Sequence, residues 1–229
     1  MNKVTIIVPV KDEEDGLEFL LEDFKRSRLK NELQVSFIFV VDIRTSDSSK
    51  KIAKKFSDNV VDQRSTTGKG AAVRQAVYYW KKNTTPFVIF LDADGSYCFD
   101  SVLDVIKELE GDADVVSGSR FSSRQGRPDG MSRLHNFGNK ALSKISSFRN
   151  RRKISDLCTG LWGFKESALY SMPLKSDGFD LEAELAGQCR KNNLLHKEIS
   201  VEWSQRKGGT SKLRSLSDGF IILLRILRT

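Results

Sequence analysis

Apolar runs and amphipathic segments alternate along the first half of the chain. Short runs of β-branched and aromatic residues predict buried strands, and apolar residues at helical spacing predict the helices between them. The strands are expected at residues 4–10, 34–41, 59–62, 87–91 and 114–119, and the helices at about 12–28, 50–56, 70–82 and 100–110. This alternation predicts an α/β fold whose open, mainly parallel sheet has helices on both faces.

The pattern changes after residue 120. An Arg-rich loop precedes helices near residues 136–147 and 180–192, strands at 161–164 and 196–203, and a final helix from Leu213. The apolar run of this final helix, residues 219–228, is shorter than the ~18–20 residues needed to cross a bilayer, but it can lie on a membrane surface. We expect one domain over residues 1–212, with halves 1–119 and 120–212, and a membrane-proximal amphipathic helix over residues 213–229.

Loops after the predicted parallel strands are expected to form one binding rim. Ligands of such sheets bind beyond the carboxyl ends of the strands, where residues 9–13, 42–47, 68–70 and 92–97 should meet. Asp92 and Asp94 leave the end of a buried strand, and extended backbone aims residues i and i+2 to the same side. Two carboxylates with phosphate oxygens suit a hard divalent cation, Mg or Mn. A turn or helix cap is the alternative role for such a pair.

The same motif also resembles the nucleophile loop of haloacid-dehalogenase-type phosphatases. In that alternative, Asp92 would attack phosphorus and Asp94 would act as acid and base. The phosphatase loop usually follows the first strand of its sheet, whereas three βα units precede the motif here. The metal site is therefore the preferred interpretation.

The net charge of +8 and the pI near 9.4 indicate an anionic partner, which could be nucleic acid, anionic lipid or nucleotide phosphate. Lys69, between two glycines at a helix start, can meet a diphosphate or merely belong to a tight turn. Basic residues that suit phosphates cluster in the second half: Arg120, Arg124, Arg127, Arg133, Arg149, Arg151, Arg152, Lys153, Arg206, Lys207 and Lys212. They lack a recognised nucleic-acid-binding module, so nucleic acid is not expected as a partner.

Cysteine and histidine usage favours an intracellular protein without a zinc site. The three cysteines have no C-x-x-C spacing and are expected to be reduced thiols. The first ten residues lack the apolar stretch of a secretory signal. His135 and His196 have no ligand partners at metal spacing and are expected to be structural.

An ordered set of motifs covers residues 4 to about 213 and resembles family-two glycosyltransferases of the GT-A fold, which is Rossmann-like. The resemblance is to the dolichyl- or polyprenyl-phosphate hexose synthases. The motifs are Val8-Pro9-x-x-x-Glu13, Val41-Asp42, Gly68-Lys-Gly-Ala-Ala-Val-Arg74, Asp92-Ala-Asp94, Gly118-Ser-Arg-Phe121, Ser132-Arg133, Thr159-Gly-Leu-Trp-Gly-Phe-Lys165 and Arg206-x-x-Gly-x-Ser-Lys212. Each motif is weak alone, but eight in the right order are specific.

The resemblance implies roles for particular residues. Residues 1–119 would hold a GDP- or UDP-linked sugar and residues 120–212 the lipid phosphate acceptor. Asp92 and Asp94 would bind Mg or Mn, and Asp94, Arg120 and Arg133 would be catalytic, with the two arginines on the acceptor phosphate. The nucleotide-sugar would be bound by Pro9, Val10, Glu13, Asp42, Lys69, Asp92, Ala93, Arg206 and Lys212.

Two positions depart from the family pattern. The usual Asp-Asp-Gly-Ser after the second strand is Asp42-Ile43-Arg44-Thr45, which bears on recognition of the base. Ser96 replaces the Gln often found two residues past the metal-binding Asp, so Ser96 or water would complete the metal site.

The expected reaction is an inverting displacement at the cytosolic face of a membrane, with the protein bound peripherally. A lipid phosphate is already ionised, so no general base is required. If the acceptor were a hydroxyl, a carboxylate base would be needed, and Asp156, Asp180 and Glu182 would be the candidates.

Overall fold

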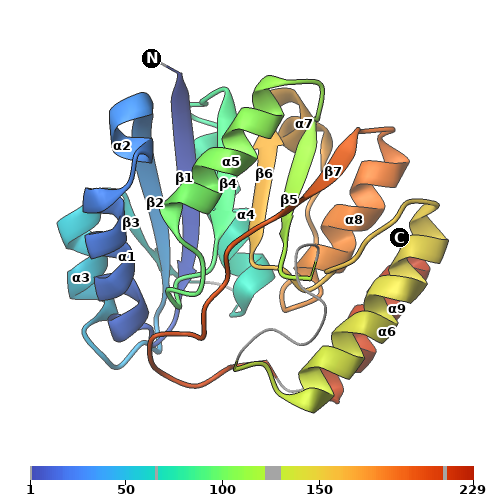
Figure 1. Cartoon of the computed structure of the whole chain (residues 1–229). Coiled ribbons are helices and arrows are strands. Elements are labelled where there is room, and N and C mark those ends of the chain that lie inside the picture. Colours follow the sequence, from blue (N-terminus) through green and yellow to red (C-terminus); the bar gives the residue numbers. More distant parts are fainter. Residues whose placement is uncertain (1, 65–66, 122–129, 214–215) are drawn as a thin grey trace.

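The computed structural model describes residues 2–64, 67–121, 130–213 and 216–229, which form a layered α/β structure (Figure 1). The strands are β1 (Lys3–Val10), β2 (Gln34–Asp42), β3 (Val60–Gln63), β4 (Phe87–Leu91), β5 (Val115–Ser119), β6 (Leu161–Lys165) and β7 (His196–Ser200). The helices are α1 (Glu14–Arg26), α2 (Leu29–Glu32), α3 (Ser49–Phe56), α4 (Lys69–Trp80), α5 (Phe99–Glu110), α6 (Arg133–Asn150), α7 (Glu166–Ser171), α8 (Leu181–Lys191) and α9 (Ser217–Arg228).

The described strands form one sheet in the order β3-β2-β1-β4-β6-β5-β7. All neighbouring pairs are parallel except those of β6, which runs antiparallel to both β4 and β5. The predicted mainly parallel sheet with helices on both faces is therefore confirmed. Because the crossover helices cover both faces of the sheet, the parallel strands are buried on both sides, which explains their continuous apolar runs.

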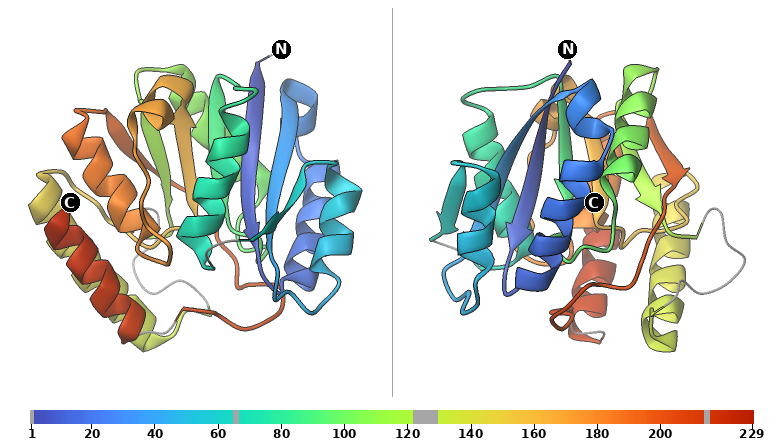
Figure 2. Two further views of the ribbon diagram at one scale, coloured as in Figure 1. Left: turned by 180° about the vertical axis from the view of Figure 1, so that it is seen from behind. Right: turned by 60° about the vertical axis from the view of Figure 1, so that its left-hand side comes forward.

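Two apolar cores lie on opposite faces of the sheet. Alternate residues of β1 divide between them, since Val4, Ile6 and Val8 belong to one core and Ile7 to the other. The first core includes buried residues of α1, α2, α3 and α5, and the second those of α4, α7, α8 and α9 (Figures 1 and 2). Each fully buried Val, Leu or Ile stabilises the fold by about 1.5–3 kcal/mol.

Some element boundaries differ from the sequence prediction. The short helices α2 and α7 were not expected, and β7 ends at Ser200 rather than near residue 203. After β7 the chain leaves the sheet and runs along the rim, where Trp203 forms an isolated β-bridge with Tyr97. Helix α9 begins at Ser217, and its Ile222 and Ile226 are buried in the second core. None of the helices in the described ranges is long and apolar enough to cross a membrane.

Candidate functional site

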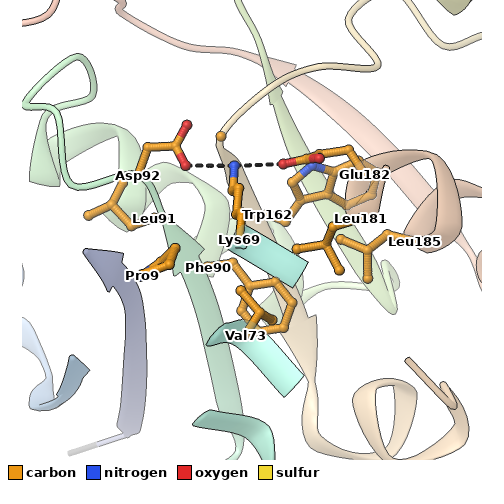
Figure 3. Close-up of a pocket in the computed structure, with 11 residues that line it drawn as sticks. Pro9, Lys69, Val73, Phe90, Leu91, Asp92, Trp162, Leu181, Glu182 and Leu185 are labelled. Atoms are coloured by element: carbon orange, nitrogen blue, oxygen red, sulfur yellow. Dashed lines mark ion pairs between the residues drawn. The ribbon is translucent and has the colours of Figure 1, made fainter. Parts of the chain in front are cut away.

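Asp92, directly after β4, lies in a small pocket that Lys69 at the start of α4 and Glu182 in α8 also line (Figure 3). The Nζ atom of Lys69 is 2.6 Å from Asp92 Oδ1 and 2.6 Å from Glu182 Oε1. Burial opposes the charge of Lys69, but the two carboxylates raise its pKa well above the usual value. The Lys69 charge is thus fixed beside Asp92, and Pro9 of β1 lines the same pocket.

Gly160 allows Asp92 to take this position. A Cβ atom on Gly160 would lie 1.9 Å from Asp92 Oδ2, and the amide of Asp92 donates to the Gly160 carbonyl at 3.2 Å. The Gly160 amide in turn donates to the hydroxyl of buried Tyr97 at 2.9 Å. Burial raises the pKa of Tyr97 to about 12, so its hydroxyl stays protonated. A residue with any side chain at position 160 would displace the Asp92 carboxylate.

Asp94 is bound by a segment from the far end of the chain, residues 203–212, which we call the strap. Arg206 Nη2 is 3.1 Å from Asp94 Oδ2, and Arg206 Nη1 is 3.3 Å from Glu13 Oε1. Lys212 Nζ is 2.6 Å from the same Glu13 oxygen. The backbone amide of Lys207 donates to the Asp94 carbonyl at 3.0 Å. The strap therefore connects the loop after β1 with the loop after β4.

Glu13 and Ala93 are held by neighbouring residues of the rim. The Glu13 amide donates to Ser49 Oγ at 2.8 Å. Burial raises the pKa of Glu13, and the charges of Lys212 and Arg206 counteract this shift. Ala93 is packed under α1, where a Cβ atom on Gly16 would lie 2.3 Å from the Ala93 carbonyl oxygen. Val10, at the end of β1, is buried in the first core.

The Asp42 carboxylate is paired with Arg44 of its own loop. Arg44 donates to it through Nε at 2.9 Å, through Nη2 at 2.6 Å and through its backbone amide at 2.9 Å. These bonds hold the pKa of Asp42 below its usual value. The departure from the family pattern at position 44 thus supplies a cation that pairs with Asp42 in this structure.

The backbone amides at the start of α4 donate to carbonyl groups of the protein and are not available to a ligand. The amides of Gly70 and Ala71 donate to the carbonyls of Gly178 and Asp177 at 3.2 and 3.0 Å. Gly70 permits this approach, since a Cβ atom there would lie 2.4 Å from the Ser176 carbonyl oxygen. Any contact of this motif with a diphosphate would therefore come from the Lys69 side chain and not from these amides.

The two predicted catalytic arginines have different surroundings. The Arg120 side chain is 12% exposed and makes a bidentate pair with buried Asp156, with Nε–Oδ2 and Nη2–Oδ1 distances of 2.7 Å each. Asn139 Nδ2 donates to the same Asp156 at 2.7 Å. Arg133, by contrast, is the exposed first residue of α6. Arg120 is therefore paired within the protein. Arg124 and Arg127 lie outside the described residues.

The carboxylates fit a divalent cation only in part. No group of three His, Cys, Asp or Glu side chains that could hold a metal occurs within residues 2–64, 67–121, 130–213 and 216–229. Asp92 and Asp94 would supply two oxygen ligands, and diphosphate oxygens and water would have to supply the others. Ser96 is buried, and its amide donates to Asp94 Oδ1 at 3.0 Å, so it supports the second carboxylate.

His196 lies in the core of the described structure. His196 is buried, stacks on Trp162 at 5.1 Å between ring centroids, and lies 2.8 Å from Ser117 Oγ through Nε2. Burial lowers its pKa to about 3. The three cysteines are free thiols.

The comparison with known families decides between the sequence interpretations. The model of the family described as Glycosyl transferase family 2 matches residues 5–172, which include the loops around Asp92 and Lys69. The chain belongs to glycosyl transferase family 2. This membership confirms the resemblance inferred from the ordered motifs, and it gives the phosphatase alternative no support.

Individual relatives and solved structures match most of the chain. Glycosyltransferase AglJ of Haloferax volcanii is 29% identical over 226 residues, 98% of this chain and 71% of that protein. The dolichyl-phosphate hexose transferase of the same organism is 26% identical over 179 residues, 78% of this chain and 74% of that protein. A crystal structure of Mycobacterium tuberculosis glucosyl-3-phosphoglycerate synthase with Mn²⁺, UDP-glucose and phosphoglyceric acid has a TM-score of 0.69 at 14% identity, covering 99% of this chain and 79% of that one. The GT-A fold is thereby confirmed.

Sequence reasoning missed most of the partners in the site. Glu182 was considered only as a possible base, and its pairing with Lys69 was not foreseen. The pairs Arg44–Asp42 and Arg120–Asp156 were also missed. The signal for Gly160 was available, because this glycine lies in one of the family motifs, but only the structure shows that it contacts Asp92.

Proposed function

We propose that this glycosyltransferase moves a hexose from a GDP- or UDP-linked donor to a polyprenyl or dolichyl phosphate. The observation that carries the proposal is the rim arrangement of Asp92 and Asp94, each 2.6–3.1 Å from a cationic side chain. A nucleoside diphosphate needs such an array of positive charges, and a divalent cation needs the carboxylates. The relative named dolichyl-phosphate hexose transferase supports the lipid phosphate as acceptor.

In the proposed reaction, an oxygen of the lipid phosphate attacks the anomeric carbon from the side opposite the diphosphate. The new carbon–oxygen bond forms as the bond to the diphosphate oxygen breaks, so the configuration inverts. Lys69 and Arg206 would balance the charge that develops on the departing diphosphate. A divalent cation bound by Asp92 and Asp94 would carry a further part of that charge.

The acceptor carboxylates support a reaction without a general base. Asp156 is paired with Arg120, Asp180 with Arg225 at 2.7 Å, and Glu182 with Lys69. Each candidate base therefore already has a cationic partner that restrains its carboxylate. A phosphate acceptor needs no proton removed, whereas a hydroxyl acceptor does.

The membrane partner and the location belong to the same proposal. We expect the protein to bind peripherally at the cytosolic face, where a lipid phosphate would be presented beside the rim. Arg133 is exposed at the start of α6 and free to turn toward an acceptor phosphate, whereas Arg120 would have to keep or exchange its pair with Asp156.

The test is transfer of labelled hexose from UDP- and GDP-sugars, with and without Mn²⁺, to a short-chain polyprenyl phosphate. Parallel reactions contain soluble acceptors with hydroxyl groups, including phosphoglyceric acid. We expect product with the polyprenyl phosphate. Product only with the soluble acceptors would contradict the lipid-phosphate proposal and leave Glu182 as the candidate base nearest to Asp92.

A further inference from the structure

Helix α6 has polar residues on its buried side and apolar residues on its exposed side. Its four buried residues are polar, and Leu142 is partly buried against the second core; the four are Asn139, Ser143, Ser146 and Asn150. Its outward stripe contains four large apolar side chains, Leu134, Phe137, Ile145 and Phe148, which are 55%, 73%, 37% and 88% exposed. Steps of three and four residues, with Ala141 completing the series, place them on one side of the helix.

The buried polar residues have a structural purpose. Asn139 accepts from the Cys158 amide at 3.2 Å and donates to Asp156, while Ser143 accepts from the Leu157 amide at 2.9 Å. These bonds hold residues 156–158, which in turn hold Arg120. The inward polarity is thus explained by the protein itself. The outward apolar stripe has no such explanation among the described contacts.

Helix α9 adds to this exposed apolar surface. It lies beside α6 in both views, and both helices begin at the end of the molecule where the carboxyl ends of β1 and β4 lie (Figures 1 and 2). Leu216, Phe220, Ile221 and Leu227 are 49–81% exposed. We call these eight exposed side chains, seven on the two helices and Leu216 directly before α9, the α6–α9 surface. Large exposed apolar groups gathered on neighbouring elements mark an interaction site.

The charge around the α6–α9 surface selects the occupant. Residues 130–153 contain seven Lys or Arg and no Asp or Glu. Lys140 and Lys144 lie exposed along the apolar stripe, and Arg151 and Lys153 are exposed just after it. Basic residues beside apolar ones are typical of helices that lie in the interface of an anionic bilayer. A second copy of this chain would bring the same positive charges against these, which disfavours a homodimer.

We propose that the α6–α9 surface inserts into the headgroup region of an anionic lipid bilayer, with α6 as a principal contact. The inference extends the predicted membrane contact of the C-terminal helix to an element in the middle of the chain. It rests on the proposed function only in that the bilayer would supply the acceptor. Because both helices begin beside the rim, insertion would bring the donor site to the level of lipid phosphates.

The test uses the full chain and vesicles of phosphatidylcholine mixed with phosphatidylglycerol, without polyprenyl phosphate. We expect binding that added salt weakens. The double substitution Phe137→Ser, Phe148→Ser should weaken partitioning roughly ten-fold or more, because two exposed aromatic anchors are lost. The matched control is Tyr78→Ser, Tyr79→Ser on α4, where two exposed aromatic side chains are removed outside this surface. Circular dichroism verifies that each variant is folded.

A second readout locates the contact. In Phe148→Trp, vesicles should shift the tryptophan emission to shorter wavelength, whereas in Tyr78→Trp they should not. Three results would overturn the proposal: no vesicle binding by the unsubstituted chain, equal binding by the Phe137/Phe148 variant, or a homodimer that this variant dissociates in place of vesicle binding.

The proposal and the proposed function can fail separately. Transfer to a short-chain polyprenyl phosphate in detergent should be unchanged by Phe137→Ser, Phe148→Ser, since neither residue is part of the donor site. Vesicle binding without any transfer to polyprenyl phosphate would refute the proposed function and leave the membrane surface standing. Transfer to polyprenyl phosphate without vesicle binding would refute the membrane surface and leave the proposed function standing.

Discussion

Strand β4 and helix α6 distribute polarity in opposite ways. Every residue of β4 is apolar and buried, and its charged groups come only after the strand has ended, at Asp92 and Asp94. Helix α6 instead buries asparagine and serine and exposes phenylalanine. Whether a side chain of an element is polar or apolar on its buried face therefore depends on what that face contacts. Asn139 and Ser143 are stable on the buried side because they accept hydrogen bonds from the backbone amides of the neighbouring loop.

The largest effect should come from removing charge at the end of β4. Asp92→Asn leaves Lys69 with Glu182 alone and removes one of the two carboxylates proposed to bind the cation. We expect kcat/KM for hexose transfer to fall roughly 10³-fold, about 4 kcal/mol of transition-state stabilisation. Steady-state kinetics measures it. Asp112→Asn, which removes an exposed carboxylate paired with Lys197, is the control and should retain activity; an equal loss in both variants would contradict the role of Asp92.

Adding one methyl group behind Asp92 should have the next largest effect. In Gly160→Ala the new Cβ atom would collide with the Asp92 carboxylate and force it away from Lys69. We expect activity to fall roughly 100-fold, about 2.7 kcal/mol. Gly138→Ala in α6 is the matched control, because nothing lies within 4 Å of a Cβ atom there. That control should stabilise the helix by up to about 1 kcal/mol and leave hexose transfer unchanged. Loss of transfer in Gly138→Ala would contradict the attribution of the Gly160→Ala effect to displacement of Asp92.

The inverted polarity of α6 can be tested by comparing a substitution on its buried side with one on its exposed side. Asn139→Ala would leave Asp156 and the Cys158 amide without one partner each, and we expect the free energy of unfolding to fall by about 2–3 kcal/mol. Phe137→Ala, two residues away on the exposed side, should change it by less than about 0.5 kcal/mol. Urea unfolding of both variants measures the difference. A larger loss for Phe137→Ala would mean that the exposed stripe packs against the protein.

The smallest effect concerns buried His196. Its pKa is lowered to about 3 in the folded protein, whereas an unfolded His titrates near 6.5. The unfolded chain therefore binds the extra proton between these values, and stability falls as the pH drops from about 6.5 toward 3. Relative to pH 7, this group should cost about 2 kcal/mol at pH 5. In His196→Gln the decrease between pH 7 and pH 5 should be smaller by that amount in urea unfolding; an identical pH dependence would contradict the assignment.

The strands and the rim could be predicted from the sequence because both depend on local signals. Continuous apolar runs mark buried parallel strands, and the carboxyl ends of such strands meet at one edge. Asp92 and Lys69 could be expected there for that reason alone. Their immediate neighbours could not, since Glu182 comes from α8, more than a hundred residues after Lys69, and no local pattern couples those positions.

Other features could not be predicted because the residues permit more than one partner. The Asp42 carboxylate was expected to bind nucleotide, but Arg44, two residues away, can reach it as well and does so. A helix near residues 136–147 was expected, but which of its sides faces the protein was not; the structure turns the apolar stripe of residues 134–148 outward. Only the positions of the 156–158 amides, which depend on the tertiary fold, decide the orientation of α6.

The place of β6 in the sheet has a consequence for the order in which the chain acquires structure. Strand β5 pairs only with β6 and β7 among the described strands, and both follow it in the sequence. During synthesis, β5 and one edge of β4 therefore emerge before their partner, and residues 120–160 must follow before β6 can join them. A ribosome-bound chain that ends near residue 119 would carry an open sheet edge, so we expect the two halves to fold as one unit and the nascent first half to depend on chaperones.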